Sequence, residues 1–149
     1  MTAFVETAGV TFLSIEKEEM KMSYYFDKKL EFSYEKAMAK VIEELKKEDF
    51  GILTDIDVKE TLKKKLNVDF RKYTILGACN PPFAYQALQA EEKIGLMLPC
   101  NVIVQETPGG GAEVSAIDPV ASMQAIENPK LQEVAQQVRA KLKKVIDQV

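Results

Sequence analysis

The apolar residues of this chain switch repeatedly between the two-residue period of a β-strand and the 3.6-residue period of an α-helix. From Met22 apolar and polar side chains alternate, which predicts a strand with one face inward. After Ser33, a good N-cap, the apolar residues form a helical stripe with lysine and glutamate on the opposite face. Phe50 to Ile56 then predicts a second strand. This switching requires a mixed structure in which helices pack against a sheet.

Asx-Pro pairs mark the beginnings of three further helices. Asn and Asp are favoured N-caps, and proline fits the next position because the N–H that it lacks would be unbonded there anyway. The pairs are Asn80-Pro81, Asp118-Pro119 and Asn128-Pro129. Asp57, with glutamate three residues later, resembles a capping box and predicts a helix that ends near Asn67.

The second half of the chain contains the remaining strands. Phe70 to Cys79 and Glu113 to Ile117 predict strands, and Ile94 to Gln105 predicts a strand that is apolar on both faces. Pro99 cannot donate a ladder hydrogen bond, which suggests a bulge or an edge at that position. A short helix around Met123 and a long C-terminal helix with a continuous apolar stripe complete the pattern.

The resulting order, β-α-β-α-β-α-β-β-α-α, predicts an α+β fold. We expect a single two-layer domain in which helices pack against one mostly antiparallel or mixed sheet. The chain length of 149 residues suits one domain. Residues 22–149 are predicted to form this domain, and residues 1–21 an N-terminal extension. The alternation would also permit a wound α/β sheet, which is the second choice.

Composition excludes several classes of function. The chain contains no histidine, so Ser-His-Asp and Cys-His nucleophile systems and histidine-containing metal sites are excluded. A net charge of −3 argues against a nucleic-acid partner, which would require a basic face. No segment has the apolar length needed to span a membrane, and the N-terminus lacks the features of a signal peptide. We therefore expect a cytoplasmic protein without a nucleic-acid or membrane partner.

Cys79 and Asn80 form the best candidate for chemistry. The pattern places Cys79 at the end of a strand and directly before a helix N-terminus, where unpaired N–H groups stabilise a thiolate. Such a thiolate could act as a nucleophile, a redox sensor or a soft-metal ligand. The simpler interpretation is a buried cysteine that packs as a small apolar side chain, with Asn80 as an ordinary cap.

Cys100 and Asn101 repeat the Cys-Asn pair one strand later. If the two strands are neighbours, the two thiols could approach each other and bind a soft ion or form a reversible disulfide. A closed zinc site needs four ligands, which one chain does not supply, so we expect neither a metal nor another cofactor. Asn80, Asn101 and Tyr73 could line a small polar pocket beside Cys79, and these residues together are the predicted ligand-binding set.

Several ordered motifs resemble the signature of the domain of unknown function 302 family. They are Gly51–Leu66, Tyr73–Pro82, Ile94–Val102 and Val114–Pro119. The resemblance covers roughly Met22 to the C-terminus and implies a small bacterial or archaeal α+β protein, often dimeric, with no settled activity. Asn67 stands where the family is expected to have glycine, and Asn tolerates the left-handed conformation.

The residues and the resemblance together favour an uncharacterised, non-catalytic domain that binds a small ligand or a partner, as a homodimer. The first alternative is a thiol-based redox sensor or enzyme centred on Cys79, and the second is a soft-metal carrier that uses Cys79 and Cys100. The sequence does not identify a substrate.

Overall fold

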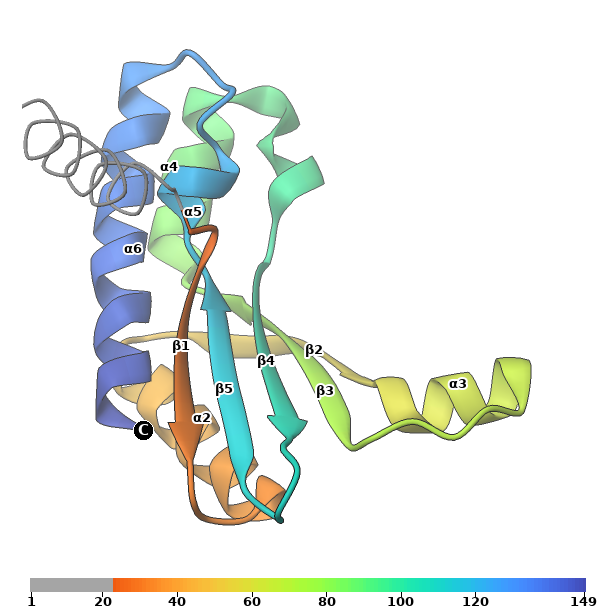
Figure 1. Cartoon of the computed structure of the whole chain (residues 1–149). Coiled ribbons are helices and arrows are strands. Elements are labelled where there is room, and N and C mark those ends of the chain that lie inside the picture. Colours follow the sequence, from red (N-terminus) through yellow and green to blue (C-terminus); the bar gives the residue numbers. More distant parts are fainter. Residues whose placement is uncertain (1–22) are drawn as a thin grey trace, which may run out of the picture.

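The computed structural model describes residues 23–149, which form one five-stranded sheet in the order β1-β5-β4-β3-β2 (Figure 1). The strands are β1 (Tyr25–Leu30), β2 (Gly51–Asp57), β3 (Tyr73–Cys79), β4 (Cys100–Glu106) and β5 (Ala112–Ile117). Every neighbouring pair is antiparallel. The predicted α+β class and element order are confirmed. The alternative of a wound α/β sheet is excluded, because such a sheet is built from parallel neighbours.

Within residues 23–149, five α-helices and one 3₁₀ helix accompany the sheet. They are α2 (Tyr34–Lys47), α3 (Val58–Leu66), α4 (Pro81–Ala90), η1 (Glu92–Met97), α5 (Pro119–Ser122) and α6 (Pro129–Gln148). Helices α2, α4, α5 and α6 gather on one side of the sheet, whereas α3 extends away from the body of the molecule (Figure 1). No helix within residues 23–149 is both long and apolar enough to cross a bilayer.

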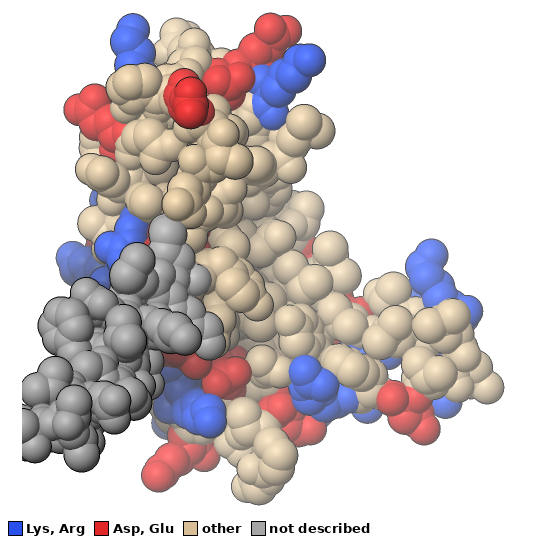
Figure 2. Space-filling view, turned by 45° about the horizontal axis from the view of Figure 1, so that its top comes forward, with Lys and Arg blue, Asp and Glu red and all other residues tan. Residues whose placement is uncertain are grey.

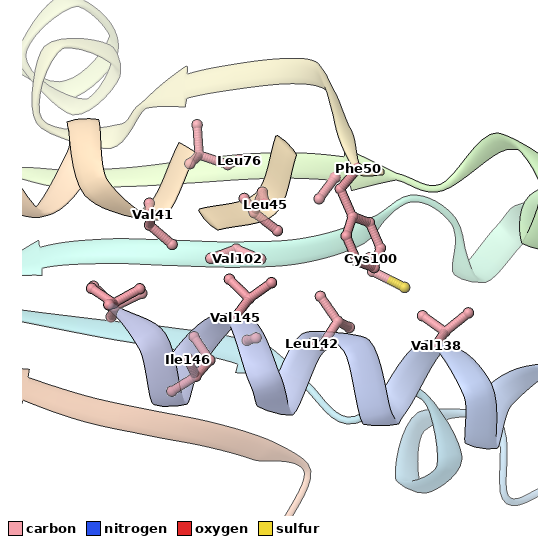
Figure 3. Close-up of a cluster of buried hydrophobic side chains, with 14 of the residues drawn as sticks. Val41, Leu45, Phe50, Leu76, Cys100, Val102, Val138, Leu142, Val145 and Ile146 are labelled. Carbon is pink, nitrogen blue, oxygen red and sulfur yellow. The ribbon is translucent and has the colours of Figure 1, made fainter. Parts of the chain in front are cut away.

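The core lies between the sheet, α2 and α6 (Figure 3). Each element contributes the apolar residues of one face, and their burial is the main stabilising term of such a layer. Six of the fully buried side chains are Val41 and Leu45 from α2, Leu76 and Val102 from the sheet, and Leu142 and Val145 from α6. The apolar stripes predicted from the sequence are therefore the faces that the helices turn toward the sheet.

Most of the predicted helix caps are present. The side chains of Ser33, Asp57, Asp118 and Asn128 each accept a backbone N–H in the first turn of the helix that follows. Asn67 adopts the left-handed conformation after α3, with φ of 53°. Asn80 differs: it lies at the N-cap position of α4, but its side chain makes no capping hydrogen bond. The prediction that Asn80 is an ordinary cap is wrong.

The segment Ile94–Gln105 is not one strand. Its first part belongs to η1, and β4 begins only at Cys100, directly after Pro99. Alternating apolar residues favoured a strand, yet Ile94 is buried while Leu96 is 87% exposed, so this alternation does not follow the faces of a sheet. The bulge expected near Pro99 is also absent from β4, and the register instead shifts in β2, between Ile52 and Thr54. The predicted strand start at Met22 and the extension over residues 1–21 lie outside the described residues.

Candidate functional site

An apolar cavity of about 340 Å³ lies where β3 ends and β4 begins. Its walls come from β2, β3, β4, α4, η1, α5 and α6 and from the segments that join them. Bulky apolar side chains from five segments that are far apart in the sequence supply much of the surface: Phe50, Phe83, Leu98, Met123, Leu131 and Val138. Cavities of roughly 300–1,000 Å³ with mostly apolar walls are typical of small-molecule sites.

Helix α4 forms one wall of the cavity and is held at both ends by side-chain amides. Asn80 Nδ2 donates to the carbonyl oxygen of Glu48 at 3.1 Å, which ties the beginning of α4 to the end of α2. Asn128 Nδ2 donates to the carbonyl oxygen of Ala90 at 2.7 Å, which ties the end of α4 to the beginning of α6. The α4 residues at the cavity include Ala84 and Ala87, whose small side chains leave the space open.

Cys79 lies at the predicted junction, as the last residue of β3 and two residues before the first residue of α4. It is partly exposed, carries a free thiol and lines the cavity. Burial raises the pKa of the Cys79 thiol. This direction is opposite to the one that a helix N-terminus alone would give, because burial among apolar side chains disfavours the charged thiolate.

Cys100 begins β4 and also lines the cavity. It pairs with Ala78, so the two cysteines lie on neighbouring strands, one position out of register. Figure 3 shows Cys100 beside Phe50, facing α6. Burial, and secondarily the neighbouring Cys79, raises the pKa of Cys100 to about 11. Both thiols are therefore protonated at neutral pH.

Tyr73 and Asn101 are not part of this cavity. Both line a separate groove of about 470 Å³ on the sheet face that none of the described helices covers. Tyr73 is six residues from Cys79 along β3, a separation of about 20 Å at the rise of a strand. The five predicted ligand-binding residues thus divide into two groups: Cys79, Asn80 and Cys100 at the cavity, and Tyr73 with Asn101 in the groove.

The chemistry available at the cavity is limited. Among the described residues, the two thiols are the only ionisable side chains that line it. Within residues 23–149, no three His, Cys, Asp or Glu side chains cluster closely enough to bind a metal ion. A charged ligand would lose its hydration there without gaining a partner of opposite charge, which is unfavourable. The arrangement suits a neutral, apolar molecule.

Sequence reasoning overlooked most of the cavity wall, including Phe83, Met123 and Val138. A signal was present in α4, whose ten residues include no charged side chain. Surface helices usually carry charges on their outer face, yet α4 exposes Tyr85 and Leu88 instead. A helix without charges on either face indicates an apolar surface beyond that needed for core packing.

Comparisons with known proteins agree with the fold. The family model described as domain of unknown function DUF302 matches residues 26–149. A solved structure, the uncharacterized conserved protein DUF302 from Bacillus stearothermophilus, is 26% identical, with a TM-score of 0.79 over 85% of this chain and 98% of that chain. The search of curated proteins gave no match. The family model covers most of the sequence, so the chain belongs to the DUF302 family, a domain of unknown function.

Proposed function

We propose that this protein is a non-catalytic domain that binds a small, neutral, apolar ligand in the cavity beneath α4. The observation that supports the proposal is the cavity itself. The space of about 340 Å³ is partly open, so its apolar lining faces water, and removing apolar surface from water is favourable. A ligand that fills the space would cover that lining.

The size and walls of the cavity narrow the ligand class. An apolar cavity of roughly 150 Å³ holds one benzene molecule, so this space suits two fused rings or an alkyl chain of similar bulk. The Cys79 thiol and the nearby Asn80 amide are the few polar groups at the wall. They would orient a single weakly polar group on the ligand.

Thermal unfolding with apolar probes tests the proposal. A series of n-alkanols from butanol to decanol, and naphthalene as a fused-ring probe, would be added to the full chain. Ligands that bind only the folded state stabilise it by about 2.7 kcal/mol at a concentration of one hundred times Kd. We expect Tm to rise with chain length and then to stop rising when the alkanol exceeds the cavity.

Two alanine variants on the same helix make the test specific. Ala84→Leu places extra side-chain atoms in the cavity and is expected to abolish the rise in Tm. Ala90→Leu makes the same change at the end of α4, outside the cavity wall, and should respond like the natural chain. If no probe raises Tm, or if the Ala84→Leu variant responds like the natural chain, the proposal is wrong.

The alternatives that use thiol chemistry have less support. A nucleophilic or redox-sensing Cys79 needs a lowered pKa, whereas burial raises the pKa of this thiol. A soft-metal carrier would need both thiols as thiolates, and the pKa of Cys100 is about 11. Rapid alkylation of Cys79 at pH 7, compared with a free thiol, would favour the redox function over simple ligand binding.

We further propose that the chain acts as a homodimer in the cytoplasm of a bacterium or archaeon. The bacterial origin of the similar solved protein supports the source. Support for the dimer comes from the second face of the sheet, which none of the described helices covers (Figure 1).

A further inference from the structure

An apolar row crosses the face of the sheet that points away from α2 and α6. Ile56 on β2 pairs with Ile75 on β3, and Ile75 pairs with Ile103 on β4. Paired residues on adjacent strands point to the same face. These three isoleucines therefore form a ladder over three strands, which we call the isoleucine row.

The isoleucine row is unusual for a sheet face in contact with water. Antiparallel sheets that cover a core on one side generally carry polar residues on the other. The neighbouring positions follow that rule, with Asn101, Gln105 and Ser115 on the same face. Ile56 is nevertheless 45% exposed, and Tyr25, which lines the groove on the same face, is 41% exposed. The row has the composition of an interface rather than of a solvated surface.

The charges of this face favour a second copy of the same chain as the occupant. The face carries Asp27 and Glu113 with Lys29 and Arg71, two of each sign, whereas the whole chain has a net charge of −3. A two-fold interface places identical patches against each other, so a neutral patch of mixed sign avoids like-charge repulsion. Charged residues lie around a largely uncharged middle in the view of Figure 2.

Within residues 23–149, two of these charges also lack an ion-pair partner. Arg71 donates from Nε and Nη2 to the neutral Oε1 of Gln105, at 3.0 and 2.9 Å, and stacks on Phe70 and Tyr73. Neither Arg71 nor Asp27 forms an ion pair within residues 23–149. Among the described residues neither charge is neutralised, and a second copy of the face would bring the opposite charge to each of them.

We propose that the isoleucine row and the charges around it form the interface of a two-fold homodimer, in which the uncovered sheet faces of two copies pack together. Such packing would bury the three isoleucines, together with Tyr25 and Tyr73, between two sheets. Each sheet would be covered by helices on its outer side. This inference rests on the proposed dimer, and it is independent of the ligand cavity, which lies on the helix side of the sheet.

Sedimentation equilibrium of the full chain tests the interface. We expect a dimer whose dissociation constant rises at least tenfold in Ile56→Lys and in Ile103→Lys, because each variant buries an unpaired charge. Leu96→Lys, at an 87% exposed position in η1, is the matched control and should leave the dissociation constant unchanged. Ile56 is on an edge strand and partly exposed, so the Ile56→Lys result decides the question even if Ile103→Lys fails to fold.

The possible outcomes separate the two proposals. A full chain that stays monomeric at all concentrations overturns the interface and the dimer together. A dimer that tolerates both substitutions, with unchanged circular dichroism, overturns the interface alone and assigns the contact to another surface. If the dissociation constant rose as much in Leu96→Lys as in Ile56→Lys, that result would also overturn the interface.

Discussion

Gly77 lies at a point of β3 where two other segments approach too closely for a side chain. A Cβ at this position would lie 2.8 Å from Cγ of Pro99 and would also overlap Oγ1 of Thr54. The Pro99 ring is rigid and Thr54 belongs to the neighbouring strand β2, so the added methyl group can be accommodated only if the proline or the backbone shifts. We expect Gly77→Ala to lower the free energy of unfolding by about 1–3 kcal/mol, the usual cost of overpacking.

Denaturant unfolding measures this effect, and Gly51 provides the control. A Cβ at Gly51 meets only the carbonyl oxygen of Cys79, at 4.0 Å, which is an ordinary contact. Gly51→Ala is therefore expected to change stability by less than about 0.5 kcal/mol. Equal losses at both positions would show that the close approach at Gly77 is not the cause.

Because of Cys100, the fold is expected to lose stability as pH rises through the alkaline range. Burial and the neighbouring Cys79 raise its pKa from 9.0 to about 11. Between these values the unfolded chain loses the thiol proton while the folded chain keeps it. The folded state then binds more protons, so the free energy of unfolding falls as pH rises through this window. The loss should be roughly 3 kcal/mol.

Urea unfolding of the natural chain and of Cys100→Ala, each between pH 8 and pH 11, would check this prediction. The variant should be less stable at pH 8 because it lacks buried atoms, but its stability should fall less steeply with pH. The two proteins differ only at position 100, so the contribution of every other group to the pH dependence of stability cancels in the comparison. Parallel pH profiles would contradict the prediction.

At the level of single residues, the sequence predicted positions better than environments. The place of Cys79 between a strand and a helix followed from local patterns, because a strand end and an Asx-Pro pair are both local signals. The direction of its pKa shift depends on α4 and α6, which pack around it from distant parts of the sequence. Asn80 likewise bonds to Glu48, which is 32 residues away.

Tyr73 and Asn101 show what the sequence could still have excluded. Tyr73 and Cys79 lie at opposite ends of β3, and six residues of extended chain keep them about 20 Å apart. That separation follows from strand geometry alone. The grouping of Tyr73 with Cys79 was therefore avoidable, whereas the cavity required the three-dimensional packing.

At the level of elements, periodicity predicted the order of helices and strands because most of them have one buried face. Periodicity was misleading at η1, where apolar residues alternate along the sequence but lie in a 3₁₀ helix. It also could not give the strand order. β1 pairs with β5, although more than 80 residues separate Leu30 from its partner Ala112. Such long-range pairing is decided by packing in the whole sheet, which local patterns do not encode.

Helix α3 offers a test of local backbone preference with little interference from packing. None of its residues is buried, and it ends at Asn67, whose φ is 53°. A β-branched side chain disfavours this left-handed conformation by about 1–2 kcal/mol, whereas glycine adopts it freely. We expect Asn67→Val to lower the free energy of unfolding by about 1 kcal/mol and Asn67→Gly to leave it unchanged or slightly higher.

Denaturant unfolding of the two Asn67 variants would measure the difference, and hydrogen exchange would show where it acts. Faster exchange should be confined to α3 and the adjoining parts of β2 and β3, the elements of residues 23–149 that the helix mainly contacts. A global change in exchange, or a loss of stability in Asn67→Gly, would mean that the asparagine side chain itself is required.

At the level of the whole molecule, the first described strand and the last helix are joined. Lys28 on β1 donates from Nζ to the carbonyl oxygens of Asp147 and Val149, at 3.0 and 2.9 Å. A lysine at the C-terminal end of a helix satisfies free carbonyl groups and opposes the helix dipole. These hydrogen bonds attach β1, the first described strand, to the C-terminal end of α6 and so connect the sheet to the helical layer.

Because β1 and the end of α6 are linked directly, we predict that a chain beginning at Met22 folds without the preceding 21 residues. Within residues 23–149 the buried apolar side chains form one continuous core from Leu30 to Val149. In the same residues no buried side-chain polar atom lacks a hydrogen-bond partner. The family model also begins only at residue 26. We expect cooperative unfolding of the shortened chain, with a free energy within about 1 kcal/mol of the full chain, the size of an ordinary single substitution.

Denaturant unfolding of both chains would measure the difference in the free energy of unfolding. Sedimentation equilibrium would compare their association, and alkanol titration would compare their ligand binding. Because the cavity and the isoleucine row are built from residues after Met22, the shortened chain should bind the same probes and associate as strongly as the full chain. A loss of more than about 3 kcal/mol, beyond most single substitutions, would mean that the first 21 residues are part of the domain. Because the described core closes without them, such a loss would require contacts on its surface, and the uncovered sheet face is the first place to seek those contacts.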